Sequence, residues 1–417
     1  MNGKNYIRSL SILGLWTLMT VEARAWHPDS SWVFNQWELG VSLGSALNDP
    51  GDMEGGFSSI WQMRFYHQYS PEDFGPQTPR HFFPAVGLVL SYADFSRTPV
   101  YREVNPPQEI YRGDYGRFFS LAISFSRYHR MWGSRHQWRL RSAIENGFAW
   151  AFNPYHYPDG MGNTIGGNFQ IYFHAGLFAS YAWGHHEIAV GPEFTHFSNS
   201  GVYLPNGGVN NIAVGLRYRT LAQTDYPHTA KEGYKLDEFL PYLYSSFYVS
   251  IGIHGEGDRG DRAEDHADIA VYSQLNLSYD LMFRFTPVVA MGLGTDFFSG
   301  CKANQLTKSW VGLGLKHESI YRHLSISACV GVYLNGMHPK GRGDSGTRIY
   351  EKIGLKYYLP VKVENVSQPY VSYHIKGNEF YAEQFEIGIG FIFDRHFRSA
   401  FVRKVQKSWE QAFRQQE

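Results

Sequence analysis

Three polar side chains between residues 187 and 219 have types and spacing suited to nucleophilic catalysis. His196 and Ser198 lie two positions apart, and Asn210 lies in the next apolar segment of the chain. A serine hydroxyl is a poor nucleophile until an adjacent imidazole accepts its proton, and the imidazole works best when a third group fixes its tautomer. Asn210 is the candidate for that third group. These residues therefore predict a Ser-His-Asn catalytic group that needs no metal and no cofactor.

Alternation along the two segments predicts that these side chains share one face. Side chains of a β-strand repeat every second residue, so the apolar even positions of the first segment form one stripe that His196 and Ser198 continue. The second segment carries a matching stripe that places Asn210 on the same outward side. The stripe residues are Ile188, Val190 and Phe194 in the first segment, and Ile212, Val214, Leu216 and Tyr218 in the second. Glu193 has the opposite parity and is expected to face inward.

The segment between the two strands is rich in Asn and Gly. It contains Asn199-Ser200-Gly201 and Pro205-Asn206-Gly207-Gly208. Loops of this composition expose backbone N–H groups that can hold an oxyanion. The alternative is an ordinary hairpin loop beside ordinary interfacial His and Ser residues, and the joint occurrence of the three polar residues with this loop favours a site.

Alternation of apolar and small or polar residues continues along most of the chain. Many of the segments are about 10 residues long with aromatic residues at their ends, which is typical of membrane strands. We therefore expect an all-β fold, a transmembrane antiparallel β-barrel of the outer membrane with about 12 to 16 strands, formed by residues 26–397 as a single barrel. The alternative is two smaller barrels joined near Thr224 to Glu238.

The two ends of the chain differ from this pattern. Lys4 and Arg8 precede a short apolar stretch and the small-residue segment Ala23-Arg24-Ala25, which predicts a cleaved secretory signal over residues 1–25. Residues 398–417 are polar and rich in Arg, Lys and Gln, which predicts a solvated C-terminal tail.

Composition excludes several other classes of protein. The 38 Lys and Arg residues balance 38 Asp and Glu residues, so a nucleic-acid partner is not expected. Hydrophobic residues make up 43% and charged residues 18%, which excludes a disordered chain. Two cysteines cannot form a disulfide scaffold, and their spacing leaves open whether Cys301 and Cys329 pair.

The stretch from His196 to Asn210 resembles the signature of the outer-membrane lipid A 3-O-deacylases. The longer chain, with further strands up to Phe393, is similar to the large acyloxyacyl-hydrolase-type proteins of Bacteroidota. This resemblance implies a serine esterase that removes an ester-linked acyl chain from the lipid A of lipopolysaccharide, with Ser198 as nucleophile and His196 as general base. It also implies that Asn199, Gly201 and Asn206 shape the loop and the oxyanion hole.

The sequence departs from this family at the third member of the triad. The short deacylases carry a glutamate where this chain has Asn210. Outer-membrane phospholipases A also have a His-x-Ser-Asn motif and use an asparagine, but their Tyr-Thr-Gln motif is absent here. A phospholipase A and a non-catalytic structural or transport barrel therefore remain the alternatives.

Overall fold

The computed structural model describes most of the chain between residues 34 and 393. The described ranges are 34–47, 57–68, 85–104, 109–134, 137–152, 167–199, 208–221, 242–256, 270–286, 288–302, 305–321, 323–336, 347–361, 368–378 and 381–393. The expected signal segment, residues 1–25, and the expected tail, residues 398–417, lie outside them. Within the described ranges, no helix has the length and apolar character needed to cross a membrane.

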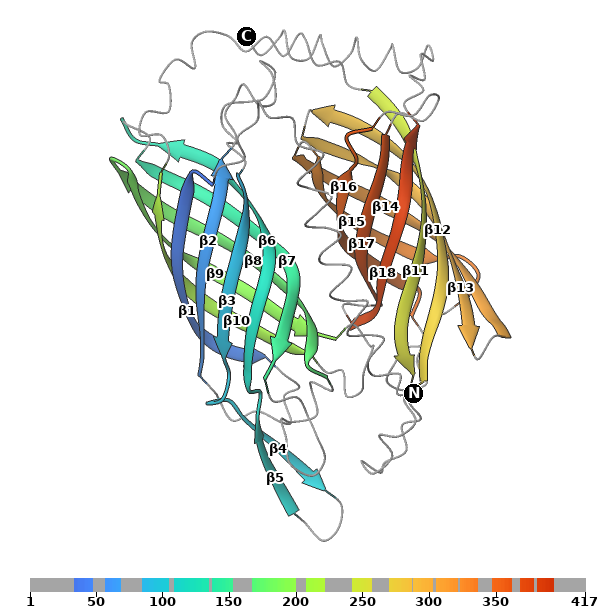
Figure 1. Ribbon diagram of the computed structural model, residues 1–417, viewed down its shortest axis with the longest axis horizontal. Coiled ribbons are helices and arrows are strands. Elements are labelled where there is room, and N and C mark those ends of the chain that lie inside the picture. Colours follow the sequence, from blue (N-terminus) through green and yellow to red (C-terminus); the bar gives the residue numbers. More distant parts are fainter. Residues whose placement is uncertain are drawn as a thin grey trace. The chain divides into compact units, whose positions relative to one another are not determined.

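Eight strands of the N-terminal half close into barrel 1 (Figure 1). Around the barrel their order is β1-β10-β9-β8-β7-β6-β3-β2, with antiparallel pairing throughout. The strands β4 and β5 form a separate two-stranded sheet between β3 and β6. The bounds are β1 Gln36–Leu47, β2 Ser58–Gln68, β3 Ala85–Asp94, β4 Pro99–Val104, β5 Glu109–Asp114, β6 Arg117–Trp132, β7 Trp138–Ala151, β8 Phe169–Trp183, β9 His186–Ser198 and β10 Val209–Thr220.

Eight strands of the C-terminal half close into barrel 2, in simple sequence order. Its first strand pairs with its last, for example Val249 of β11 with Ile389 of β18. The bounds are β11 Tyr242–Glu256, β12 Ala270–Thr286, β13 Val289–Lys302, β14 Gln305–Tyr321, β15 Leu324–Tyr333, β16 Ile349–Tyr358, β17 Gln368–Asn378 and β18 Tyr381–Phe393.

The expectation of a single barrel of 12 to 16 strands over residues 26–397 is therefore wrong. The described residues contain eighteen strands, of which sixteen form two closed sheets of eight and two form the separate β4–β5 sheet, so the alternative of two smaller barrels is confirmed. Barrel 1 ends at Thr220 and barrel 2 begins at Tyr242, on either side of the polar stretch from Thr224 to Glu238. Closure of β1 onto β10 uses both edges of the first sheet, so no free edge remains for β11 to extend it.

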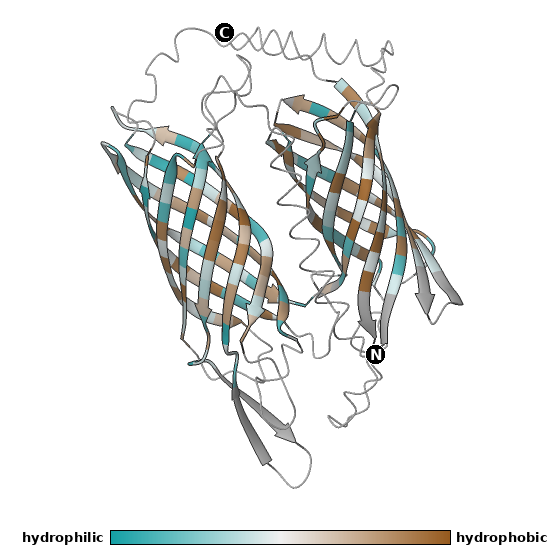
Figure 2. Cartoon of the chain, in the orientation of Figure 1, coloured by the Kyte–Doolittle hydropathy of each residue, from teal (hydrophilic) through white to brown (hydrophobic). Residues whose placement is uncertain are grey.

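The outer walls of both barrels are apolar. Figure 2 shows apolar and polar residues alternating along the strands. Val214 of β10 and Val330 of β15 are 60% and 59% exposed, although both are aliphatic. Rows of exposed aliphatic side chains are unfavourable in water and suit a hydrocarbon environment, where closed barrels satisfy every backbone hydrogen bond.

Charged residues fill the interior of each barrel. In barrel 1 the carboxylate of Glu38 lies 3.2 Å from Arg64, 2.7 Å from Arg141 and 2.8 Å from Arg219. In barrel 2, Lys316 lies 2.7 Å from Asp296, and Lys352 lies 2.9 Å from Glu386. Buried charges of this kind are stable only when paired, so the ion pairs allow a polar interior inside an apolar wall.

Each barrel has two distinguishable ends. We call the end where its first strand begins and its last strand finishes the terminal end, and the opposite end the loop end. The longest connection of each barrel, 95–116 in barrel 1 and 334–348 in barrel 2, is at the loop end. Two-residue connections are at the terminal ends, 184–185 in barrel 1 and 287–288 and 322–323 in barrel 2, but barrel 2 also has two of them, 303–304 and 379–380, at its loop end. Short turns on the periplasmic side and longer loops outside are typical of outer-membrane barrels.

Candidate active site

Strands β9 and β10 bring His196 and Asn210 together at the loop end of barrel 1. The two residues are direct partners in the antiparallel register. The apolar side chains at even positions of both strands are exposed or half-buried, and inward odd positions such as Glu187 and Phe197 are buried. The register therefore places His196 and Asn210 side by side at the end of the predicted outward stripe, and Ser198 follows with the same parity as His196.

A hydrogen bond fixes the imidazole of His196. Its Nδ1 atom lies 2.7 Å from Oδ1 of Asn210. An amide oxygen only accepts hydrogen bonds, so Nδ1 must carry the proton and Nε2 of the neutral ring is left as the proton acceptor. This is the tautomer that a general base needs in order to take a proton from a hydroxyl through Nε2.

Ser198 follows His196 on the same face and is the last residue of β9. Its register partner on β8 is Ile171, and the partner of His196 is Phe173. Ser198 is only 3% exposed. The nucleophile candidate thus lies at the point where an apolar outer wall meets the loop end.

Gly208 lies next to the candidate pair, although its place in the sequence predicted only a residue of the Asn/Gly-rich loop. It precedes β10 and has a φ of +67°. A Cβ atom built on it would lie 3.0 Å from Cε1 of His196 and 3.7 Å from Cβ of Ser198. Only glycine allows both this backbone conformation and this close approach. In the sequence, the Gly-Gly pair before the second strand indicates only a tight turn and not the approach to His196.

An aromatic cluster supports the end of β9 from inside the barrel. Phe197 lies between His196 and Ser198, and its fully buried ring stacks on Phe118 with centroids 4.3 Å apart. Phe95 and Tyr172 pack against the same ring at 5.9 and 5.5 Å. Because side chains alternate, fixing the inward residue also fixes the backbone that carries its two outward neighbours.

Deeper in the barrel, polar contacts join β9 to β10. Glu193 faces inward, as its parity predicted, and forms an ion pair with Arg217. The same carboxylate accepts a hydrogen bond from Ser42 of β1. His174 of β8 lies 3.6 Å from it. Glu193 therefore stabilises the barrel wall behind the site and does not contribute to the outward face.

The predicted oxyanion residues are only partly described. Asn199 is buried directly after Ser198. Gly201 and Asn206 lie outside the described residues, so their predicted role stays a prediction. The described residues contain no group of three or more His, Cys, Asp and Glu side chains placed to hold a metal ion. Cys329 has a free, buried thiol, and the side chain of Cys301 is not among those described.

Two family models match the chain, one in each barrel. Residues 89–219 match lipid A 3-O-deacylase (PagL), and residues 243–395 match the acyloxyacyl hydrolase C-terminal domain. The first match contains His196, Ser198 and Asn210. No curated protein matches the chain.

Several solved β-barrel structures are similar to parts of the chain. The crystal structure of the outer membrane enzyme PagL aligns with 43% of this chain and 97% of its own, at 13% identity and a TM-score of 0.30. The β domain of the Bordetella autotransporter BrkA aligns with 86% of this chain and 98% of its own, at 8% identity and a TM-score of 0.22. A triple-mutant porin of Rhodopseudomonas blastica aligns with 86% and 99%, at 7% identity and a TM-score of 0.16.

The two family matches follow one another along the sequence: the first lies within barrel 1, from β3 to β10, and the second spans the strands of barrel 2. The chain therefore belongs to the family of lipid A 3-O-deacylases and acyloxyacyl hydrolases.

Proposed function

We propose that the protein is an outer-membrane serine esterase that removes an ester-linked acyl chain from the lipid A of lipopolysaccharide. The observation that carries this proposal is the 2.7 Å hydrogen bond from His196 to Asn210 at the end of an apolar outer stripe, two residues before Ser198. The family match over residues 89–219 supports lipid A as the substrate class.

The reaction begins with proton transfer from Ser198 to Nε2 of His196. The Oγ atom then bonds to the ester carbonyl carbon, and negative charge develops on the carbonyl oxygen. Collapse of this intermediate breaks the ester C–O bond, and the lipid A alkoxide takes the proton from the imidazolium. Water then attacks the acyl-serine with His196 again as base, which releases the fatty acid and restores the hydroxyl.

Asn210 orients the ring throughout these steps. Its amide oxygen accepts from Nδ1–H and so keeps Nε2 directed to the reacting proton. A neutral amide stabilises the imidazolium less than a carboxylate does. We therefore expect a slower enzyme than one with glutamate at this position, with the same chemistry.

The developing oxyanion requires hydrogen-bond donors close to Ser198. Asn199 is adjacent in the chain, and the connection 199–208 contains Gly201 and Asn206. We propose that these three residues shape the oxyanion hole, in which preorganised N–H groups supply much of the rate enhancement.

The outer wall is a suitable place for a lipid substrate. Acyl chains can remain in the hydrocarbon beside the exposed aliphatic residues of β9 and β10, while the ester reaches His196 and Ser198 at the interface. The loop end corresponds to the cell exterior if the barrel follows the usual orientation of outer-membrane barrels. Lipopolysaccharide occupies that leaflet, so no extraction of the substrate is needed.

A phospholipase A is the second candidate, because Asn210 and the His-x-Ser-Asn motif suit that family too.

The test compares the wild-type protein with Ser198→Ala, each refolded in detergent. Each protein is incubated with lipopolysaccharide and, separately, with phospholipid, and both lipid pools are measured by mass spectrometry. We expect lipid A to lose one acyl chain with the wild type only. Ser198-dependent release of fatty acid from phospholipid alone would favour the phospholipase. No Ser198-dependent change in either pool would leave a non-catalytic barrel.

A further inference from the structure

The outer wall of barrel 2 carries a second His-x-Ser pair. His317 and Ser319 lie on β14, and Nε2 of His317 is 3.0 Å from Oγ of Ser319. Both side chains continue the outward stripe of Val311, Leu313 and Leu315, all of which are exposed. The order, spacing and face of this pair match those of His196 and Ser198.

The residue between the two is anchored inside the barrel, as Phe197 is in barrel 1. Glu318 is buried and lies 3.1 Å from the ammonium of Lys356. Its carboxylate also accepts a hydrogen bond of 2.6 Å from Ser325 and another from Tyr358. These contacts fix the backbone of β14 at this point, so His317 and Ser319 are held on a rigid element, which a catalytic pair requires.

Apolar residues flank the pair on the neighbouring strands. Val289 of β13 and Ile326 of β15 are the register partners of Ser319. Met291 and Ala328 are those of His317. Met291 is exposed, Ile326 is buried, and His317 and Ser319 are half-buried. The hydroxyl and the imidazole therefore lie among apolar side chains, and the exposed side of the pair is the one that the ester of a lipid would meet.

The two pairs differ in the end of the barrel at which they lie. His196 and Ser198 are at a loop end, before the connection 199–208, whereas Ser319 is close to the two-residue turn 322–323 at the terminal end of barrel 2. The longest connection of barrel 2, 334–348, is at the opposite end, and longer loops mark the outer side of outer-membrane barrels, so the terminal end is assigned to the periplasmic side. The lipid esters available at that side are those of glycerophospholipids in the inner leaflet.

We propose that Ser319 and His317 form a second esterase site, which hydrolyses an acyl ester of a glycerophospholipid at the terminal end of barrel 2. His317 takes the hydroxyl proton at Nε2, and Oγ of Ser319 bonds to the ester carbonyl carbon. The lysophospholipid leaves with that proton, and water then hydrolyses the acyl-serine to a free fatty acid. The register partners of His317 carry no hydrogen-bonding side chain, so this site is a dyad and slower than the site in barrel 1.

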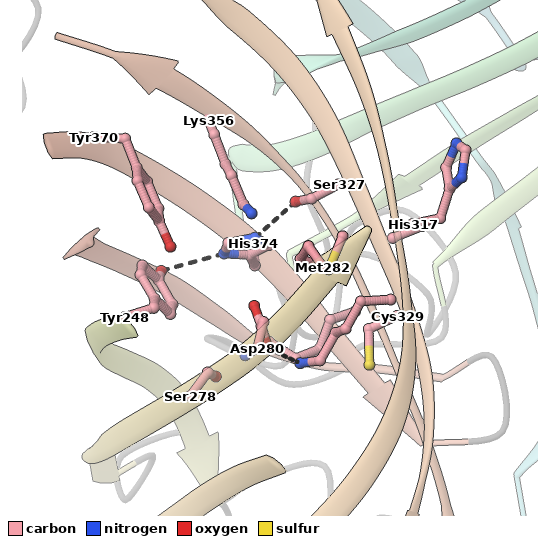
Figure 3. A pocket seen from close by; sticks show the side chains of 13 residues that line it. Tyr248, Ser278, Asp280, Met282, His317, Ser327, Cys329, Lys356, Tyr370 and His374 are labelled. Atoms are coloured by element: carbon pink, nitrogen blue, oxygen red, sulfur yellow. Dashed lines mark hydrogen bonds and ion pairs between the residues drawn. The ribbon is translucent and has the colours of Figure 1, made fainter. Parts of the chain in front are cut away.

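A polar cluster inside barrel 2 is a less suitable place for such chemistry. Oγ of Ser327 lies 2.9 Å from Nε2 of His374, whose Nδ1 lies 3.2 Å from the hydroxyl of Tyr248 (Figure 3). The adjoining cavity is about 30 Å³, room for water but not for a lipid. Figure 3 shows the ring of His317 directed away from this cluster.

The test uses the full chain with Ser198→Ala as background, which removes the proposed site of barrel 1. Vesicles of phosphatidylethanolamine and phosphatidylglycerol are the probe, and released fatty acid is measured by mass spectrometry. We expect slow release by Ser198→Ala that falls at least about tenfold when Ser319→Ala is added. His317→Gln must have the same effect, because a glutamine can hydrogen-bond the serine but cannot accept its proton.

Ser142→Ala in the same background is the matched control. Oγ of Ser142 also lies 2.8 Å from Nε2 of a histidine, His129. These two residues lie on different, neighbouring strands, β7 and β6, beside a register shift, and so do not form a His-x-Ser pair. Unchanged migration of unheated protein on a denaturing gel checks folding. The proposal is overturned if Ser198→Ala releases no fatty acid above background, if release survives in both Ser319→Ala and His317→Gln, or if Ser142→Ala removes it.

Discussion

In the proposed mechanism, Asn210 determines how strongly the imidazole of His196 acts as a base. Its amide accepts the 2.7 Å hydrogen bond that fixes the tautomer. We expect Asn210→Ala to lower the rate of lipid A deacylation by roughly 10²-fold or more, since a free imidazole samples the wrong tautomer and orientation. Asn210→Glu should raise the rate above that of the wild type. Initial rates with lipopolysaccharide measure both, and equal rates for all three proteins would show that Asn210 has no part in orienting the ring.

Gly208 has a positive φ and lies against the proposed catalytic pair, and Gly184 in the β8–β9 turn provides a comparison. Gly184 also has a positive φ, of +53°, but a Cβ atom there would meet nothing within 4 Å. Both alanine substitutions therefore introduce a similar backbone strain of about 1–2 kcal/mol. Only Gly208→Ala should lower the rate of deacylation, because its Cβ would press on the edge of His196. A matching loss of rate in Gly184→Ala would attribute the effect to strain alone.

At the scale of elements, the end of β9 depends on the aromatic cluster around Phe197. Phe118→Ala removes the ring that stacks on Phe197 and should lower the free energy of unfolding by about 3 kcal/mol or more. We expect a loss of activity as well, because the strand end that carries His196 and Ser198 loosens. Phe298 is equally buried, but in barrel 2. Phe298→Ala should lower the free energy of unfolding by a similar amount, measured by urea unfolding, and leave lipid A turnover unchanged. A loss of turnover in Phe298→Ala would show that the loss of activity in Phe118→Ala is not local to β9.

Much of these elements could be predicted from the sequence. The period of two along residues 188–194 and 212–218 correctly assigned the outward faces, and hence placed His196 and Asn210 on one side. Their pairing across the strands agrees with that assignment. The approach of Gly208 to His196 could not be predicted, because it depends on how the chain enters β10 and not on alternation. The pair on β14 could not be recognised from the sequence for another reason. His317 and Ser319 are polar residues at the end of an apolar strand, which is a common pattern and does not by itself indicate a site.

At the scale of the whole molecule, the number of barrels could not be read from the strand pattern. The strands show the same alternation whether sixteen of them form one barrel or they form two barrels of eight strands each. What decides is which distant strands pair, here β1 with β10 and β11 with β18, and these pairs bring together residues far apart in sequence. The polar stretch from Thr224 to Glu238 was the local sign of the boundary, but polar loops also join strands within one barrel.

Closure of each sheet predicts that barrel 1 folds alone. A chain that ends at Leu221 keeps every strand of that barrel and leaves no open edge. We expect the shortened protein to show the migration of a folded barrel on a denaturing gel without heating. It should also retain lipid A deacylation within about threefold of the full chain, since compact domains with their own interior fold independently. A fragment that fails to fold would show that barrel 2 is needed to stabilise barrel 1.

The central claim, that Ser198 is a nucleophile activated by His196, is tested most directly by a long-chain fluorophosphonate that labels activated serines. Peptide mass spectrometry locates the adduct, and the time course gives the labelling rate. The account predicts that the fastest adduct forms on Ser198, that His196→Asn abolishes it, and that Asn210→Ala slows it. Fastest labelling of another serine, or labelling of Ser198 that does not depend on His196, would contradict it.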